Sequence, residues 1–168
     1  MNKYIPIGFL AAWALINTLP LSAVEQGDPM PNCALPSLQG QNTFRLDQYK
    51  GQVIYVDFWA SWCGPCAQSF PFLNSLHSEF KDQGLTILGV NVDEEKPLAR
   101  EFLAKYPAAF PILNDAEGQC ATNFAVKGMP SSYLIDKQGI VHHVHLGFRP
   151  SEAEEIRTLV HQLLAAKK

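Results

Sequence analysis

The chain has 168 residues, of which 47% are hydrophobic and 17% are charged, and its formal net charge is −3 at pH 7. This length and composition predict one folded domain with an ample hydrophobic core and exclude an intrinsically disordered chain. Because the sequence contains no block of basic residues, nucleic acid is excluded as an expected partner.

The N-terminus has the pattern of a secretory signal peptide. Lys3 supplies a positive charge, residues 4–21 are mostly apolar, and small residues lead up to Ala23. We predict a signal peptide at residues 1–23 that is cleaved to leave a mature domain at residues 24–168. The alternative is an uncleaved N-terminal membrane anchor, although the apolar run falls short of the ~20 residues that a membrane span needs. In either case the domain is expected to face an exported, oxidising compartment.

Apolar periodicity and turn residues predict the elements in chain order. The first half is expected to contain a hairpin, a buried central strand, a helix and a second central strand, at residues 33–38 with 43–46, 53–59, 63–82 and 86–92. The second half is expected to contain a helix, a short strand, a further helix and a closing hairpin, at residues 97–106, 110–113, 117–124 and 132–135 with 140–146. A last helix follows, for which Ser151 and Glu154 form a predicted capping box. Strands that alternate with helices predict an α/β fold, with helices on both faces of a central sheet.

Two cysteines come directly after the predicted strand at residues 53–59, in the run Trp62-Cys63-Gly64-Pro65-Cys66. Cysteines three residues apart at the start of a helix lie one turn apart, which is close enough for a disulfide. The helix dipole and the free N–H groups at that end stabilise a thiolate. The motif therefore predicts a reversible dithiol/disulfide pair and the activity of a thiol–disulfide oxidoreductase. A zinc site is the alternative, but Cys33 and Cys120 are single and distant in sequence.

The chain resembles the thioredoxin superfamily, and more closely its periplasmic TlpA/ResA branch of protein disulfide reductases. The residues that carry the likeness are 59–66, 89–93 and 128–136, and the likeness extends from about residue 30 to the C-terminus. It implies a thioredoxin fold with a central mixed sheet, an N-terminal hairpin and a βα-type insertion. It also implies a periplasmic reductase of protein disulfides that receives electrons from a membrane partner. We expect a monomer that needs no cofactor.

Cys63 lies nearer the helix start than Cys66, so it is expected to be the more exposed thiol and the one with the lower pKa. Its thiolate would attack a substrate disulfide, and Cys66 would then resolve the mixed disulfide after losing a proton. Asp57 is the candidate base, because burial in the apolar strand would raise the pKa of its carboxyl. The resemblance also places a buried acid at this position. The alternative for Asp57 is a strand-edge carboxylate in solvent.

By the resemblance, Pro130 is a cis proline that faces the Cys63–Cys66 pair and exposes the backbone of the preceding residue to a substrate chain. Without the resemblance, an ordinary trans proline in a turn would be the expectation. The residues expected to line the substrate groove are Trp62, Gly64, Pro65, Met129 and Gly147.

Three positions depart from the pattern of related families. Ser69 stands where ResA-like and cytochrome-maturation members commonly carry a glutamate, and Asp57 stands where they often have an uncharged residue. Gly89 stands where thioredoxins often have a lysine, so one positive neighbour of the buried acid is missing. These departures argue against a role dedicated to cytochrome c maturation and leave general disulfide reduction unaffected.

Cys33 and Cys120 have two interpretations, as small buried hydrophobic residues or as a structural disulfide that ties down the N-terminal hairpin. The sequence leaves both open.

Three histidines occur close together near the C-terminal end. His143 and His145 would share one face of the expected strand and His142 would take the other. Solvated strand positions are the preferred interpretation, and no metal site is expected.

Two alternative functions remain from the sequence. One is a disulfide oxidant or isomerase of the same fold, and the other is a copper-binding metallochaperone module that uses Cys63, Cys66 and a histidine. Gly64-Pro65 favours the reductant, since strong oxidants of the superfamily usually carry a histidine between the two cysteines.

Overall fold

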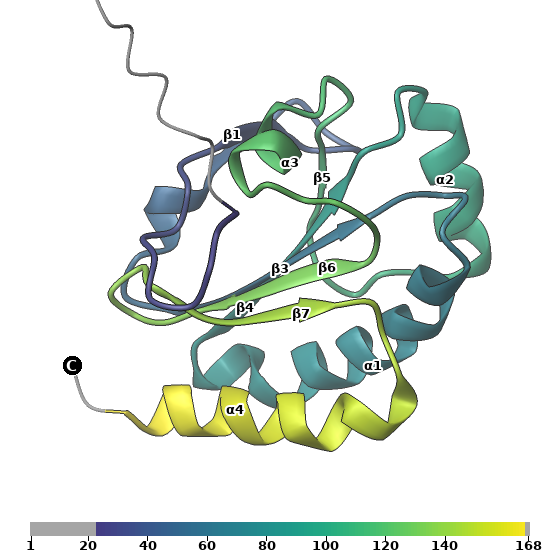
Figure 1. The fold of residues 1–168 in the computed structure, drawn as a ribbon. Helices are drawn as coiled ribbons and strands as arrows, with labels where there is room; N and C mark the ends of the chain where they lie inside the picture. Colours follow the sequence, from purple (N-terminus) through teal and green to yellow (C-terminus); the bar gives the residue numbers. More distant parts are fainter. Residues whose placement is uncertain (1–22, 167–168) are drawn as a thin grey trace, which may run out of the picture.

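A five-stranded mixed sheet forms the centre of the computed structural model, which describes residues 23–166 (Figure 1). The strand order is β5-β4-β3-β6-β7. Strands β3, β4 and β5 run parallel to one another, whereas β6 is antiparallel to β3 and β7 is antiparallel to β6. The strand bounds are Val53–Trp59 for β3, Leu85–Asn91 for β4, Ile112–Asn114 for β5, Ser131–Ile135 for β6 and Val141–Leu146 for β7.

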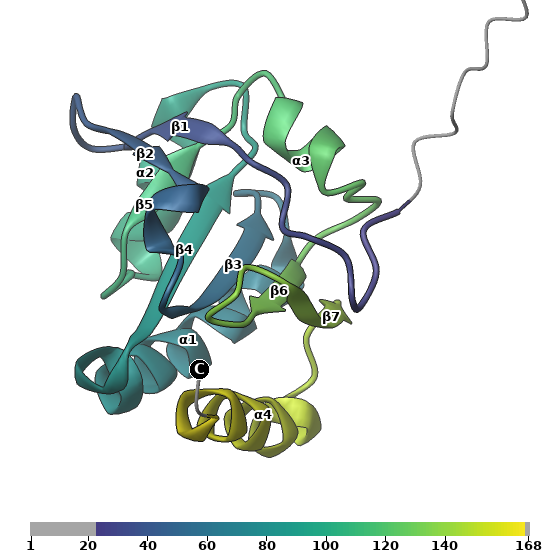
Figure 2. The same cartoon turned by 90° about the vertical axis from the view of Figure 1, so that its left-hand side faces the viewer.

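Strand β3 is buried at all seven positions, because it lies in the middle of the sheet with both faces covered. One face is covered by α1 (Gly64–Phe80) and α4 (Ala153–Ala165), with α2 (Lys96–Lys105) at one end of this layer. The other face is covered by the hairpin of β1 (Ala34–Pro36) and β2 (Thr43–Arg45) and by the short helix α3 (Gln119–Asn123). Figure 2 shows the two layers on opposite sides of the strands.

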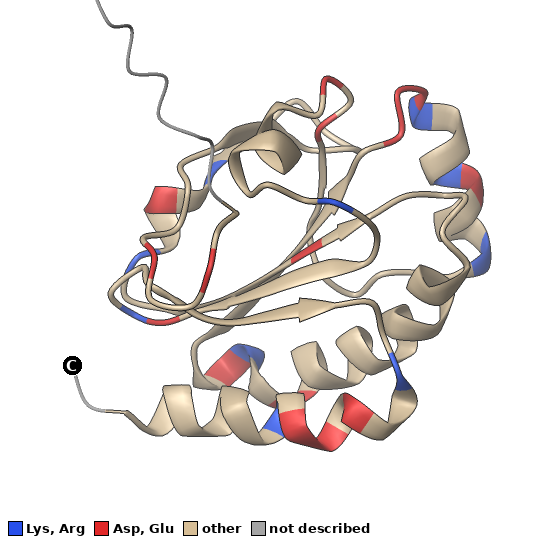
Figure 3. Cartoon of the chain, viewed as in Figure 1, with Lys and Arg blue, Asp and Glu red and all other residues tan. Residues whose placement is uncertain are grey.

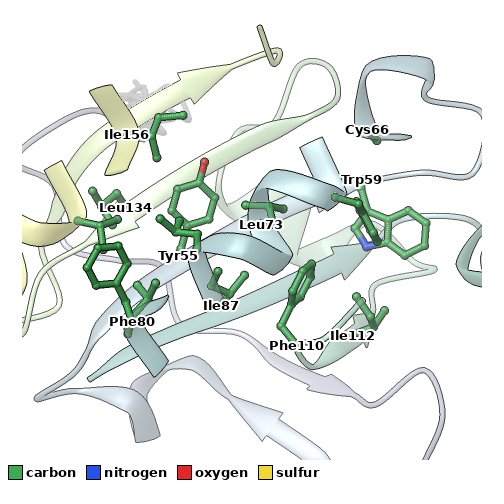
Figure 4. Close-up of a cluster of buried hydrophobic side chains, with 14 of the residues drawn as sticks. Tyr55, Trp59, Cys66, Leu73, Phe80, Ile87, Phe110, Ile112, Leu134 and Ile156 are labelled. Atoms are coloured by element: carbon green, nitrogen blue, oxygen red, sulfur yellow. The ribbon is translucent and has the colours of Figure 1, made fainter. Parts of the chain in front are cut away.

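Alternate side chains of β3 build two separate cores. Tyr55 and Trp59 point toward α1 and α4, where they pack with side chains such as Leu73 and Ile156 (Figure 4). Val56 and Phe58 point the other way, toward the N-terminal hairpin and α3. The period of two along a strand produces this division, so Asp57 shares the α1 face with Tyr55 and Trp59.

The structure confirms the predicted α/β thioredoxin fold with a central mixed sheet, flanking helices and an N-terminal hairpin. Most observed bounds lie within a few residues of the predicted ones. Helix α1 is followed by a 3₁₀ turn, η2 (Lys81–Gln83), and the chain leaves it through Gly84 at φ +101°, a left-handed conformation that suits glycine. Within residues 23–166 no helix is long and apolar enough to cross a membrane. The predicted signal peptide, apart from Ala23, lies outside the described residues.

The predicted capping box of Ser151 and Glu154 is wrong. Residues 150–152 form a 3₁₀ turn, η3 (Pro150–Glu152), and the N-cap of α4 is Glu152, which makes no side-chain cap hydrogen bond. Ser151 lies inside the 3₁₀ turn that begins at Pro150 and is therefore not at the N-cap position of α4. The Glu154 carboxylate instead accepts a hydrogen bond from Arg157 at 3.3 Å.

The structure places a disulfide between Cys33, just before β1, and Cys120 in α3, with the two Cα atoms 5.7 Å apart. Both cysteines are buried in the core beneath the N-terminal hairpin. The backbone adds a contact here, since the Leu46 N–H donates to the Cys33 carbonyl at 3.0 Å. The bond therefore ties the N-terminal hairpin to α3 within the layer that covers the face of the sheet opposite α1.

We predict that replacing both Cys33 and Cys120 by alanine lowers the free energy of unfolding. The bond closes a segment between residues 87 apart, and a loop of this size restricts the unfolded chain enough to contribute about 4 kcal/mol. Urea unfolding of the variant and of the unsubstituted protein measures the difference. The control is the same comparison in a reducing buffer, where neither protein has the cross-link. If the two proteins differ in stability by the same amount there, the loss comes from packing and the predicted contribution of the disulfide is contradicted.

Candidate redox site

Cys63 and Cys66 lie at the start of α1, a few residues after the end of β3. The structure holds them as a disulfide with Cα atoms 5.3 Å apart. Cys63 is the N-cap of α1, with an extended backbone, and its Sγ accepts the Cys66 N–H at 3.2 Å. Gly64 and Pro65 form the first two helical positions, where the missing N–H of proline costs nothing. The Cys66 N–H also donates to the Cys63 carbonyl at 3.2 Å, so the helix start shares this N–H between the carbonyl and the sulfur of Cys63, where it supports a thiolate.

The two sulfurs differ in exposure in the predicted sense, although the difference is small. Cys63 is 4% exposed and Cys66 is 0% exposed. Figure 4 shows Cys66 beside Trp59 at one end of the buried cluster. Ser69 is also buried, and its hydroxyl donates to the Cys66 carbonyl at 3.0 Å, so the residue at the family's glutamate position is bonded within its own helix.

Asp93 fixes the loop in front of Cys63, a role that the sequence analysis missed. Its carboxylate, which is buried, accepts the Ser61 N–H at 2.9 Å and the Ser61 hydroxyl at 2.9 Å, and it also accepts the Asn91 side-chain amide at 2.7 Å. These bonds connect the loop after β3 to the end of β4. The signal in the sequence was an acid just beyond a buried strand, whose partner 32 residues away could not be identified.

Asp57 is 1% exposed and is the only Asp, Glu, Lys or Arg in the five strands of the described sheet (Figure 3). Its Oδ1 accepts the hydroxyl of Ser132 at 2.6 Å, and its Oδ2 has no hydrogen-bond partner in residues 23–166. Burial raises the pKa of the Asp57 carboxyl to about 7, and the bond from Ser132 offsets part of that rise. The strand-edge alternative for Asp57 is therefore wrong.

The surroundings of Asp57 hold no compensating positive charge in the described sheet. Gly89 lies directly opposite Asp57 on β4. A Cβ at Gly89 would come 2.7 Å from the end of the Ile112 side chain and 3.1 Å from the Phe110 ring, so a lysine there would require both neighbours to move. Tyr55, two residues before Asp57, has a pKa raised by its burial and by the Asp57 charge, so it stays neutral.

The loop before β6 contains a cis peptide bond between Met129 and Pro130. The Pro130 carbonyl accepts the N–H of Gly147 at 2.8 Å, which joins this loop to the end of β7. Met129 packs against the buried cluster that contains Cys63 and Cys66. The structure thus brings four of the predicted groove positions to one end of the sheet, whereas Trp62 projects into solvent, 71% exposed.

The three histidines lie in β7, and two of them contact each other and a neighbouring carboxylate rather than a cysteine. His143 and His145 stack with their ring centroids 6.1 Å apart, and the His145 Nε2 lies 3.2 Å from the Glu152 carboxylate. Among the residues that the structure describes, no three His, Cys, Asp or Glu side chains gather into a metal-binding group.

Comparison with known proteins gives a consistent result. The model of the Redoxin family matches residues 25–163. Thiol-disulfide oxidoreductase ResA of Geobacillus kaustophilus is 35% identical over 131 residues, which cover 78% of this chain and 75% of the relative. ResA of Bacillus subtilis is 32% identical over 125 residues, covering 74% and 69%. A crystal structure from Chlorobium tepidum, described as a thiol:disulfide interchange protein DsbE, aligns with a TM-score of 0.81 at 41% identity, covering 85% of this chain and 100% of the other.

We predict that Asp57→Asn stabilises the oxidised protein increasingly as pH rises. The pKa of about 7 lies above the 3.8 of a free carboxyl, so the stability that protonated Asp57 contributes is fully present below about pH 4. That contribution is lost as pH rises through 7, and at ~1.4 kcal/mol per pKa unit the loss reaches about 4 kcal/mol. Urea unfolding of both proteins at pH 4 and pH 9 measures the difference in their free energies of unfolding. A difference between the two proteins that is the same at both values would contradict the buried, protonatable carboxyl.

We further predict that Ser132→Ala raises the pKa of Asp57, because it removes the one hydrogen bond that favours the carboxylate. The carboxyl titration can be followed by carbon-13 NMR of aspartate-labelled protein. Ser131→Ala is the matched control, since the neighbouring Ser131 hydroxyl donates to the Gly128 carbonyl instead. Ser132→Thr keeps a hydroxyl and should restore the titration. Equal shifts in the Ser131 and Ser132 alanine variants would show that the Ser132 bond has no specific effect.

Proposed function

We propose that this chain, which belongs to the Redoxin family, works as a reductase of protein disulfides in the periplasm. Its relatives identify it as a thiol–disulfide oxidoreductase of the thioredoxin superfamily and of the TlpA/ResA type. The observation that carries the direction is that neither the Cys63–Cys66 motif nor the first turn of α1 contains a basic or histidine side chain that would stabilise a thiolate. The described first turn of α1 has no basic residue, Gly64-Pro65 supplies no imidazole, and the buried carboxyl of Asp57 lies on the face of the sheet that α1 covers. A dithiol whose thiolate is weakly stabilised is a good reductant, because strong oxidants owe their potential to a stabilised reduced form.

In the first step the Cys63 thiolate attacks one sulfur of the substrate disulfide. A bond forms between the Cys63 Sγ and that sulfur, the substrate S–S bond breaks, and the second substrate sulfur leaves as a thiolate that takes a proton from water. The N–H of Cys66 supports the attacking thiolate, since it already points at the Cys63 Sγ in the disulfide form.

In the second step Cys66 resolves the mixed disulfide. The fully buried thiol of Cys66 must lose its proton, and the Asp57 carboxylate is the group proposed to receive it. The Cys66 sulfur then attacks the Cys63 Sγ, the Cys63–Cys66 bond forms, and the first substrate sulfur leaves as a thiolate. The substrate gains two electrons and the enzyme dithiol loses them. With a pKa near 7, Asp57 can accept a proton and return it to solvent at neutral pH.

Continued turnover requires a source of two electrons for the oxidised enzyme. The predicted signal peptide supports an exported location, and an oxidising compartment provides no soluble pool that keeps a dithiol reduced. We therefore assign the supply of electrons to a partner in the membrane. The chain is proposed to act as a monomer, and its steps need no cofactor.

The equilibrium reduction potential of the Cys63–Cys66 pair tests the proposed direction. With Cys33 and Cys120 replaced by serine, so that one couple is titrated, we predict a value at or below about −250 mV, as in thioredoxin-like reductants. Glutathione or dithiothreitol redox buffers, with alkylation and mass analysis, provide the measurement. A potential near about −120 mV would instead place the pair with the oxidants and overturn the reductase assignment.

A further inference from the structure

Three of the four large hydrophobic side chains that are exposed in the described part of the chain gather beside the redox disulfide. Trp62 is 71% exposed, Leu98 is 45% exposed and Tyr106 is 39% exposed, and the fourth, Leu146, lies elsewhere, on β7. Leu98, at the start of α2, and Tyr106, just past its end, line the same hollow as Trp62. An exposed apolar stripe of this kind next to a reactive group marks a contact surface.

The stripe borders a hollow of about 360 Å³ that also reaches Cys63. Trp62 and Cys63 form one wall, and Leu98, Phe102 and Tyr106 on the α2 side form the other. Phe102 is buried and packs against the rings of Trp59 and Tyr106, with ring centroids 4.8 Å and 4.9 Å apart, so this side of the hollow rests on packed aromatic rings. The hollow is continuous with the redox site because Cys63 lines both.

The charges at the hollow favour a neutral occupant. Glu101 and Lys105 lie four residues apart on α2 and line the hollow with opposite signs. Neither sign dominates, so the surface offers a charged side chain no net attraction, whereas a large apolar side chain would remove apolar surface of both partners from water.

The position of Cys63 identifies the source of that side chain. Only 4% of Cys63 is exposed, so a disulfide that reaches its sulfur brings the neighbouring residues of its own chain across the adjacent surface. On the other side, the loop at Pro130 offers backbone groups, and main-chain pairing discriminates little between sequences. Selection between substrate sequences therefore requires a side-chain pocket, and this hollow is one that borders the attacking sulfur.

We propose that the hollow between Trp62 and α2 binds a large apolar side chain of the substrate polypeptide, one or two residues from the cysteine that Cys63 attacks. The chain would thus prefer protein disulfides flanked by leucine or an aromatic residue over those flanked by small polar residues. This inference rests on the proposed function, because a polypeptide disulfide must reach Cys63, but it does not depend on the direction of electron flow.

The test uses peptide disulfides that are identical except for phenylalanine or serine one or two residues on either side of the cysteine. Single-turnover oxidation of the reduced, full-length mature protein, followed by tryptophan fluorescence, gives the rate at each peptide concentration. We expect the apparent second-order rate constant to be about tenfold higher for the phenylalanine peptide at the preferred position, mainly because that peptide saturates the rate at a lower concentration. Leu98→Ser and Tyr106→Ser should each remove most of this preference.

Leu146→Ser is the matched control, since it removes an exposed leucine of the same kind from β7, outside the hollow, and should keep the preference. Loss of the preference in this variant but not in the Leu98 and Tyr106 variants would overturn the proposal. Equal rates for both peptides in the unsubstituted protein would do the same while leaving disulfide reduction intact. Failure to reduce either peptide or a small aromatic disulfide would contradict the proposed function instead. A concentration-dependent dimer that Leu98→Ser abolishes would place a second copy of this chain in the hollow and also overturn the proposal.

Discussion

Strand β3 is paired along both edges, with β4 on one side and β6 on the other, and each part of the redox site is attached to one of these three strands. Its C-terminal end leads into the helix that begins at the Cys63–Cys66 pair, Asp93 follows two residues after the end of β4, and Pro130 directly precedes β6. A central strand with both faces covered cannot shift its register without moving apolar side chains to the wrong core. This constraint makes the geometry around the disulfide rigid.

The same burial creates the chemistry of Asp57. A carboxyl in the middle of a dry sheet face is costly when charged, and a single hydroxyl from Ser132 offsets only part of that cost. The protein therefore gives up stability at alkaline pH in exchange for a group that changes protonation near neutrality. Gly89 supports this arrangement, because it places no side chain opposite Asp57 and the side chains of Ile112, Phe110 and Trp59 pack closely against it.

The two faces of the sheet have different roles, one structural and one chemical. The face with the N-terminal hairpin is fastened by the buried Cys33–Cys120 disulfide and its aromatic neighbours. The opposite face carries the reactive cysteines, the unpaired carboxylate oxygen and the hollow against α2. Because the two disulfides lie in different cores, the structural bond can hold the fold while the redox bond opens and closes.

The sequence alone determined the strands, the helices, the Cys-x-x-Cys motif at a helix start and the burial of Asp57, because these follow from local periodicity and from the composition of one apolar strand. Only the tertiary structure decided that Ser132 bonds Asp57 across 75 residues, that Asp93 holds Ser61, and that α2 lies beside Cys63. It also decided between the two interpretations of Cys33 and Cys120, and it replaced the expected capping box with a 3₁₀ turn. Contacts between distant segments depend on strand register and packing, which local patterns do not specify.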